Sequence, residues 1–180
     1  RDGDKIRVPQ STENLENAVT LEGAVVRPGV YGWVAGQRIS DIISSISSDL
    51  KPYADLGYGL VVRQKNAELD IEVLQVSLAE ALNNAGSQDN ILTQARDKII
   101  VFSRASVTDI SSLDADADAD AEINLSQRDV LLRPVIAKLR SQARSGEPVQ
   151  TVSVSGAVKS PGDYPLGQKD TVANLIAAGG

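Results

Sequence analysis

A stretch of 25 residues occurs twice in this chain, and the repeat constrains the fold more than any other feature of the sequence. Residues 19–43 align with residues 152–176 at a constant offset of 133 positions, without a gap. Such a repeat predicts one structural unit that is used twice. Eight positions are identical in the two copies: Val19/Val152, Gly23/Gly156, Ala24/Ala157, Val25/Val158, Pro28/Pro161, Gly29/Gly162, Tyr31/Tyr164 and Ile43/Ile176.

Each copy has the pattern of a β-hairpin. In the first copy, β-branched residues run through 19–26 and resume at 30–34, which is typical of two strands. Pro28-Gly29 suits the centre of a type II turn, because proline fixes the first φ and glycine accepts a positive φ at the second position. Gly23 and its counterpart Gly156 interrupt the first strand, so we expect a bulge or a close approach of another backbone segment there.

A helix is predicted after each hairpin. In the second copy, Asp170 is a good N-cap and Gly179 a suitable end, whereas Gln37 caps the first helix less well. The first helix is expected to be continuous, because its apolar residues follow helical spacing and form one stripe. These residues are Ile39, Ile42, Ile43, Ile46 and Leu50.

The first copy continues with the elements of a complete module. Strands are expected at 60–63 and 69–76, joined by a polar turn at 64–68, and a closing strand at 97–102. Ser77 and Glu80 have the spacing of a capping box, which predicts a short helix between these strands. Residues 19–104 are therefore expected to form one compact α+β module, and residues 151–180 the first half of another.

The first residues of the chain repeat the closing strand. The segment at 3–9 parallels 96–102, so residues 1–10 are interpreted as the closing strand of a preceding module, in a chain cut from a longer protein. The half-module at the other end would then expose a sheet edge. We expect this edge to pair with residues 5–8 of the same chain or of a neighbouring one.

The net charge of −6 arises in one acidic segment, since residues 105–125 hold six carboxylates and no Lys or Arg. We interpret this segment as a solvated, self-repelling linker. The alternative is a weakly held divalent cation at Asp114, Asp116, Asp118 and Asp120, whose spacing is similar to that of a calcium-binding loop. That loop would require Gly and Glu where Ala119 and Leu125 stand.

A helix is predicted at 126–145, and Pro134 is expected to kink or split it. It is either a docking helix for partner subunits or a spacer that packs on its own neighbours. Its apolar stripe consists of Val130, Leu131, Val135, Ile136, Leu139 and Ala143.

Composition argues against catalysis. The chain has neither Cys nor His, which removes thiolate chemistry and the commonest general base. The sequence lacks a phosphate-binding loop and a nucleophile elbow, and its clustered carboxylates fall in the linker. No basic cluster suits a nucleic acid. We therefore expect no enzyme, no cofactor and no nucleic-acid partner.

The two repeats, "VTLEGAVVRPGVYGWVAGQRISDII" and "VSVSGAVKSPGDYPLGQKDTVANLIAAGG", resemble the soluble-ligand-binding β-grasp (SLBB) module. The string "RDGDKIRVP" is similar to the Gly-Asp-x-Ile-x-Val segment that closes such modules. Tandem copies, with a helix like "LLRPVI" before the later one, resemble the outer-membrane polysaccharide export proteins of Gram-negative bacteria. Arg96 departs from this pattern, because the family has glycine there, and the first helix ends in "SSDL" instead of Ala-Gly-Gly.

The resemblance implies an α+β fold of tandem β-grasp (SLBB) modules, joined by an acidic linker and a helix. It implies a non-catalytic, periplasmic module of a capsular or exopolysaccharide export protein, associated with the outer membrane through parts of the parent protein absent from this chain. Its expected partners are the polysaccharide, further subunits in a homo-oligomer and an inner-membrane copolymerase. The alternative is a β-grasp module that binds a soluble small ligand, such as a cobalamin-like cofactor or a short glycan.

Sugars stack on aromatic rings and accept hydrogen bonds, which selects the candidate ligand contacts. Tyr31 and Trp33 are two residues apart and share one strand face, where they either bind ligand or pack in the core. The charged candidates beside the Pro-Gly pairs either contact acidic sugars or are simply solvated. The full set is Tyr31, Trp33, Tyr164, Arg27, Lys159, Tyr53 and Tyr58, the last two expected at an exposed loop.

Overall fold

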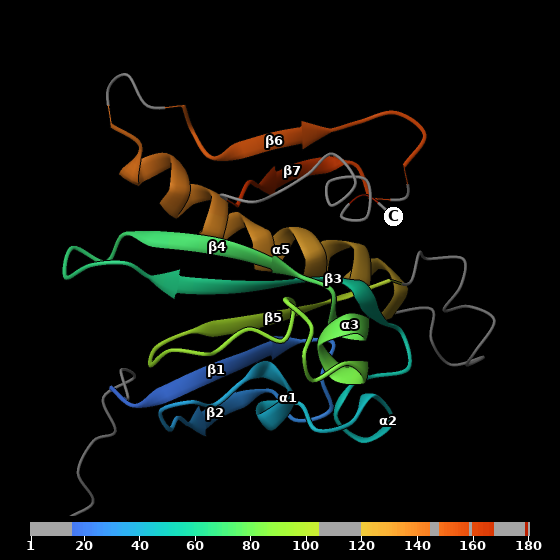
Figure 1. Cartoon of the computed structure of the whole chain (residues 1–180). Coiled ribbons are helices and arrows are strands. Elements are labelled where there is room, and N and C mark those ends of the chain that lie inside the picture. The colour runs from blue at the N-terminus through green and yellow to red at the C-terminus, as the bar shows by residue number, and fades with distance from the viewer. Residues whose placement is uncertain (1–15, 105–119, 145–147, 159, 168–178, 180) are drawn as a thin grey trace, which may run out of the picture.

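The computed structural model describes residues 16–104, 120–144, 148–158, 160–167 and 179, and of residues 120–127 the backbone alone. These parts form a mixed α+β structure, as expected (Figure 1). The predicted closing strand at 1–10, most of the acidic segment and the second-copy helix lie outside the described residues.

A five-stranded mixed sheet is the centre of the molecule. Its strand order is β2-β1-β5-β3-β4, in which β1 and β5 are parallel and the other pairs are antiparallel. The strands are β1 (Ala18–Gly23), β2 (Gly29–Gly32), β3 (Ala54–Gln64), β4 (Ile71–Val76) and β5 (Lys98–Ser103). The helices are α1 (Ile39–Ile42), α2 (Ile46–Asp49), α3 (Leu78–Asn83) and α5 (Asp120–Gln142), and a separate hairpin is formed by β6 (Thr151–Val154) and β7 (Gly162–Pro165).

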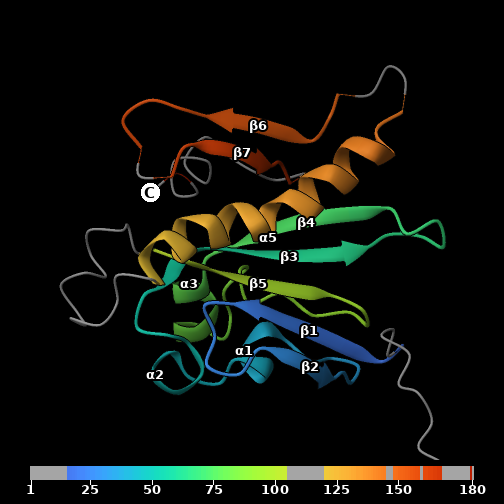
Figure 2. The same ribbon diagram turned by 180° about the vertical axis from the view of Figure 1, so that it is seen from behind.

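The sheet separates two hydrophobic cores. Because side chains alternate along a strand, Ile99 and Val101 of β5 enter one core, and Ile100 and Phe102 enter the other. All four side chains are buried, as befits the central strand. The first core lies beneath α1, α2 and α3. The second lies beneath α5, which lies between the sheet and the β6–β7 hairpin (Figure 2).

The two hairpins have the same register. Val19 pairs with Tyr31 in the first, and Val152 pairs with Tyr164 in the second, both at the repeat offset. The match extends to single hydrogen bonds. The Tyr31 hydroxyl donates to the Arg27 carbonyl over 2.6 Å, and the Tyr164 hydroxyl donates to the carbonyl at the equivalent position over 2.7 Å. The prediction that each repeat forms a strand–strand hairpin is confirmed.

The predicted type II turn is wrong in both copies. Gly29 and Gly162 are the first residues of β2 and β7, with φ of 155° and 159°, far from the value near +80° that such a turn needs. In the first copy the chain does not reverse tightly, because Ala24 and Val25 are buried in the core before β2 begins. Burial of these two residues therefore overrides the local preference of the Pro-Gly pair.

The expectation for Gly23 is confirmed. Its φ is +96°, and an added Cβ would lie 2.0 Å from the Val101 carbonyl oxygen on the neighbouring strand β5. Only glycine fits both the conformation and the space.

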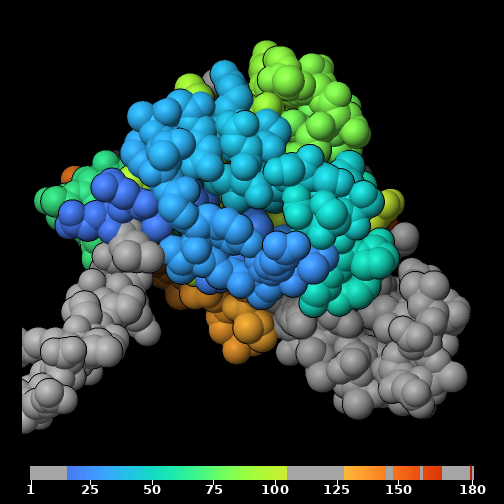
Figure 3. Space-filling view, turned by 90° about the horizontal axis from the view of Figure 1, so that it is seen from below, coloured from blue at the N-terminus to red at the C-terminus, as the bar shows by residue number. Residues whose placement is uncertain are grey.

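The predicted continuous first helix is also wrong, since it is divided into α1 and α2. Ile43 and Ser45 have extended backbones, and the Asp49 carboxylate accepts hydrogen bonds from the N–H groups of Ser44 and Ser45. This carboxylate satisfies N–H groups that a continuous helix would have bonded internally. Ile39 and Ile43 are nevertheless fully buried, so the apolar stripe was read correctly. Figure 3 shows the β1–β2 hairpin with α1 and α2 in the centre of one face (blue to cyan).

The later elements of the first module agree with the prediction, except for the start of β3. The Ser77 hydroxyl accepts a hydrogen bond from the Glu80 N–H over 3.3 Å and begins α3. The β3 strand starts at Ala54, six residues earlier than the expected range. Just before β5, the Asp97 carboxylate is buried and forms a two-pronged ion pair with Arg63, which fixes the loop that leads into the strand.

The α5 helix starts at Asp120, inside the segment interpreted as a linker, and is continuous through Pro134, so the expected split is wrong. Pro134 and Val130 are exposed, so water can satisfy the Val130 carbonyl that loses its helical partner. Leu132 and Leu139 are among the side chains buried against the sheet, which confirms that the helix packs on its own neighbours. None of the described helices is long and apolar enough to span a bilayer.

Candidate functional site

An arginine in an aromatic cage joins the main sheet to the second hairpin. The Arg128 guanidinium carbon lies 5.3 Å from the ring centre of Tyr58, 5.0 Å from that of Phe102 and 5.7 Å from that of Tyr164. These rings come from β3, β5 and β7, and the arginine comes from α5. Cation–π contacts of this kind strengthen when they are shielded from water. The cage therefore holds the main sheet, α5 and the second hairpin together.

A buried carboxylate completes this cluster. Arg128 contacts Asp55 at 3.4 Å, and their side chains are 8% and 9% exposed. The other Asp55 oxygen accepts hydrogen bonds from the N–H groups of Gly57 and Tyr58. Burial raises the pKa of the Tyr164 phenol above its usual value near 10, although the Arg128 charge opposes this shift. The ion pair and the ring contacts of this cluster stabilise the docking of the second hairpin, while the buried Arg128 Nε has no hydrogen-bond partner among the described residues.

The second hairpin is also held through its polar atoms. The Gln75 amide donates to the Pro165 carbonyl over 3.2 Å, and Arg140 forms a 2.7 Å ion pair with Asp163. A hydrogen bond from Ser153 and the Arg140 contact hold the pKa of the Asp163 carboxyl below its usual value. The orientation of the hairpin is thus set by contacts with both α5 and β4.

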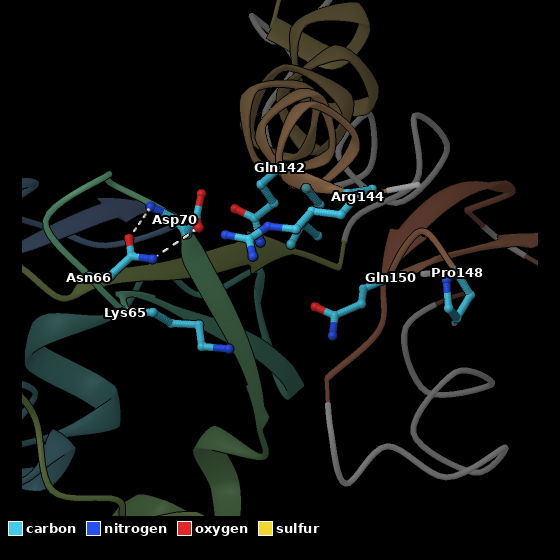
Figure 4. Close-up of a pocket in the computed structure, with 9 residues that line it drawn as sticks. Lys65, Asn66, Asp70, Gln142, Arg144, Pro148 and Gln150 are labelled. Atoms are coloured by element: carbon cyan, nitrogen blue, oxygen red, sulfur yellow. Dashed lines mark hydrogen bonds between the residues drawn. The ribbon is translucent and has the colours of Figure 1, made fainter. Parts of the chain in front are cut away.

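A polar hollow opens where the end of α5 meets the β3–β4 turn and the residues before β6 (Figure 4). Lys65 and Asn66 of the turn form one side, Gln142 and Arg144 of the helix end form another, and Gln150 faces them from the start of the second hairpin. No aromatic residue lines this hollow. It is the candidate functional site, because it gathers charged and hydrogen-bonding side chains at the surface.

Some groups in this hollow are already fixed. The Gln142 amide pairs with both backbone groups of Ile71, donating over 2.7 Å and accepting over 2.8 Å, in the manner of a neighbouring strand. Asn66 exchanges hydrogen bonds with Asp70, accepting from its N–H and donating to its carboxylate. These bonds shape the hollow and leave each amide with unused hydrogen-bonding capacity.

A second hollow lies on the other side of the same turn. Lys65 and Asn66 line it as well, together with Asn17, Gln64 and Arg96. Arg96 has φ of +71°, at the position where the resembling family has glycine. The Lys65–Asn66 turn is therefore polar on both of its sides.

Tyr31 and Trp33 are half-buried and pack against the first core, which favours the core-packing interpretation. The Trp33 indole donates to the Thr93 carbonyl over 3.0 Å. Tyr53 also packs against this core and lies beneath the Lys51 ammonium. These rings are separate from the polar hollow.

Tyr58 and Tyr164 belong to the aromatic cage. Tyr58 is 2% exposed, so its expected position at an exposed loop is wrong. The reason is that β3 starts early and carries the residue into the second core. Arg27 is exposed beside the first hairpin, and its role in ligand binding stays a prediction.

Lys159, Asp114, Asp116 and Asp118 lie outside the described residues, and the side chain of Asp120 is not described. Among the residues that the structure describes, no group of acidic side chains is arranged to hold a metal ion. Lys65, Gln142, Arg144 and Gln150 were missed as site residues. In the sequence they stand in a polar turn, a helix end and an interrepeat segment, and no local signal brings them together.

Neither the models of protein families nor the curated proteins with which the sequence was compared gave a match.

Proposed function

We propose that this chain is a non-catalytic, periplasmic building module of a capsular or exopolysaccharide export protein, made of tandem β-grasp (SLBB) modules. The strand order β2-β1-β5-β3-β4, with β1 and β5 parallel, is the order of a β-grasp sheet and supports the first module. Location and outer-membrane association, through parts of the parent protein outside this chain, follow from the same resemblance.

The observation that carries the proposal is the structural identity of the two hairpins. The Trp33 N–H donates to the Asn17 carbonyl, and the Leu166 N–H donates to the Gln150 carbonyl. These two hydrogen bonds stand at the repeat offset and extend the two hairpins in the same way. Register, glycine conformations and tyrosine hydrogen bonds agree as well. A second β-grasp module beginning at residue 151 accounts for all of these matches.

The second hairpin also suggests how subunits join. In the first module β1 is paired on both sides, by β2 and by the parallel strand β5. In the second hairpin β6 has the β7 neighbour, while its other side is not paired with any described strand. We expect this side to accept a strand of the Gly-Asp-x-Ile-x-Val type, such as residues 5–8 of the same chain or of a neighbouring one. Pairing with a neighbouring chain would produce a homo-oligomer.

Sedimentation of the full chain over a range of concentrations tests this proposal. In the first module the Thr20 N–H donates to the Asp97 carbonyl at the start of the β1–β5 pairing. The Ser153 N–H holds the equivalent position in β6. Ser153→Pro removes this donor and should abolish self-association, because proline cannot donate to a ladder. Ser153→Val is the matched control, since it removes the same hydroxyl and keeps the N–H. A wild-type chain that stays monomeric, or equal association of both variants, would refute the assembly.

The small-ligand alternative predicts an apolar pocket with a few convergent polar groups. The two hollows beside the β3–β4 turn are instead lined mainly by polar and charged side chains. Calorimetric titration with a cobalamin distinguishes the two functions. We expect no binding, and tight equimolar binding by a strict monomer would overturn the export proposal.

A further inference from the structure

The two hollows beside the β3–β4 turn form a continuous surface, because Lys65 and Asn66 line both of them. We name this surface the amide track. Its line runs from Gln150 and Arg144, over the Lys65–Asn66 turn, to Asn17 and Arg96. A ligand that contacts both hollows must span the Lys65–Asn66 turn that they share, so it must be extended.

The turn in the middle of the track is held in shape by its own hydrogen bonds. The Gln64 amide donates to the Asn66 carbonyl over 3.0 Å, and the Asn66 amide donates to the Asp70 carboxylate over 2.9 Å. The Lys65 N–H donates to the Asp70 carbonyl over 2.7 Å. A surface that is already ordered loses little conformational entropy when a ligand binds.

The track is lined by three cations, Lys65, Arg96 and Arg144, and by two carboxylates, Glu16 and Asp70, so the net charge of its lining is +1. Lys65 and Arg144 form no ion pair with any described residue, and the Arg96 contacts with Glu16 and Gln64 are long, at 3.4 and 3.5 Å. The Asp70 carboxylate is already opposed by Lys138, 4.0 Å away. Cations that form no ion pair attract an anionic ligand.

The chemistry of the lining selects the class of anion. Carboxamides such as those of Gln150 and Asn17 both donate and accept hydrogen bonds, which matches the hydroxyl groups of a sugar. No aromatic side chain lines either hollow, so a neutral sugar would find no ring on which to stack. Arg and Lys pair with carboxylates through charge-assisted hydrogen bonds. An extended ligand that is rich in hydroxyl groups and carries carboxylates can span both hollows, bond to the carboxamides and pair with the cations.

We propose that the amide track binds a linear acidic saccharide whose residues carry carboxylates. This inference rests on the proposed export function and names the class of glycan that the module contacts. The chain's own acidic segment is a poor competitor within one molecule. The described residues that bound it, Arg104 and Asp120, lie toward the start of α5, whereas the track lies at the end of this helix, about 33 Å away along its axis.

Binding of a galacturonate hexamer to the full chain, measured by calorimetry, tests the proposal. The comparison ligand is the same hexamer with its carboxylates reduced to alcohols. We expect saturable binding of the acidic hexamer that weakens with added salt, and no binding of the neutral one. Equal affinity for both hexamers would overturn the proposal, and so would the absence of binding to the acidic hexamer.

Two variants locate the site. Lys65→Gln and Arg144→Gln should each weaken binding by about tenfold, the loss expected when one charge-assisted hydrogen bond is removed. Arg133→Gln is the matched control, because Arg133 is an exposed cation of α5 outside the amide track. An equal loss in all three variants would show attraction to net charge alone and would refute the site.

A poly-glutamate peptide of equal charge distinguishes the saccharide from an acidic protein segment. Binding of the peptide as tight as that of the hexamer would refute the saccharide class. These outcomes are independent of self-association. A chain that self-associates without binding the hexamer would contradict this inference and leave the export proposal standing. A chain that binds the hexamer but stays strictly monomeric would support this inference and contradict the proposed assembly.

Discussion

Arg128→Met should loosen the second hairpin and destabilise the whole described fold. The substitution keeps an unbranched side chain in the aromatic cage but removes the positive charge beside Asp55. The carboxylate of Asp55 would then be buried with only the N–H groups of Gly57 and Tyr58 as donors. A buried charge without its partner is poorly solvated, and this effect should dominate the loss of stability.

The expected loss is about 3–5 kcal/mol, the range measured when one partner of a buried ion pair is removed. Asp55→Asn should also destabilise the fold, because Arg128 then lacks its counter-ion. The double variant should lose much less than the sum, since it leaves no buried charge. An interaction free energy of about 2 kcal/mol between the two positions is therefore expected from the double-mutant cycle.

Urea unfolding measures these free energies through the fluorescence of Trp33, the single tryptophan of the chain. Hydrogen exchange of the β6 and β7 amides reports separately on the hairpin, and Arg128→Met should accelerate it. Losses under about 1 kcal/mol that simply add in the double variant would refute the reasoning, because they would show that the ion pair is not shielded from water.

Three further substitutions test individual features. Gly23→Ala should destabilise the fold by more than about 3 kcal/mol, because the added Cβ would lie 2.0 Å from the Val101 carbonyl oxygen. Gly156→Ala should cost only about 1–2 kcal/mol, because its φ is +105° but no atom lies within 4 Å of the added Cβ. Equal losses of stability in urea unfolding would contradict this difference. Arg96→Gly should leave the stability unchanged or raise it by up to about 1 kcal/mol, since φ is +71° and the side chain is exposed, and a clear loss on thermal unfolding would be the contrary result. Burial raises the pKa of Tyr164, so its neutral phenol stabilises the fold fully below pH 10, and this contribution is lost as the pH rises through the raised pKa. Tyr164→Phe should therefore reduce the loss of stability at alkaline pH. An unchanged dependence of stability on pH would show that Tyr164 does not cause this loss.

The elements that depend on local pattern could be predicted from the sequence. The hairpin pairing, the Ser77 cap of α3 and the strand β5 agree with the sequence because alternation and capping residues determine them locally. Apolar periodicity also identified Ile39 and Ile43 as buried. It missed the break between α1 and α2, because the pattern of apolar residues does not show where the Asp49 carboxylate will bond.

The site could not be predicted because it is assembled by tertiary structure. Arg128 stands among polar residues near the start of a predicted helix, and only its position against β3, β5 and β7 reveals the cage. Lys65 and Gln150 are 85 positions apart and meet only because α5 docks the second hairpin on the sheet. The aromatic candidates were chosen by residue type, and the structure shows that most of them pack in the two cores.

The parallel pairing of β1 with β5 has a mechanical consequence. The chain enters the first module through β1 and leaves it through β5, and adjacent parallel strands place these two points at opposite ends of the same ladder. Tension applied along the chain would therefore shear the hydrogen bonds between residues 20–23 and 98–101 together, instead of opening them one after another. A module connected in this way should resist stretching far better than its modest size suggests.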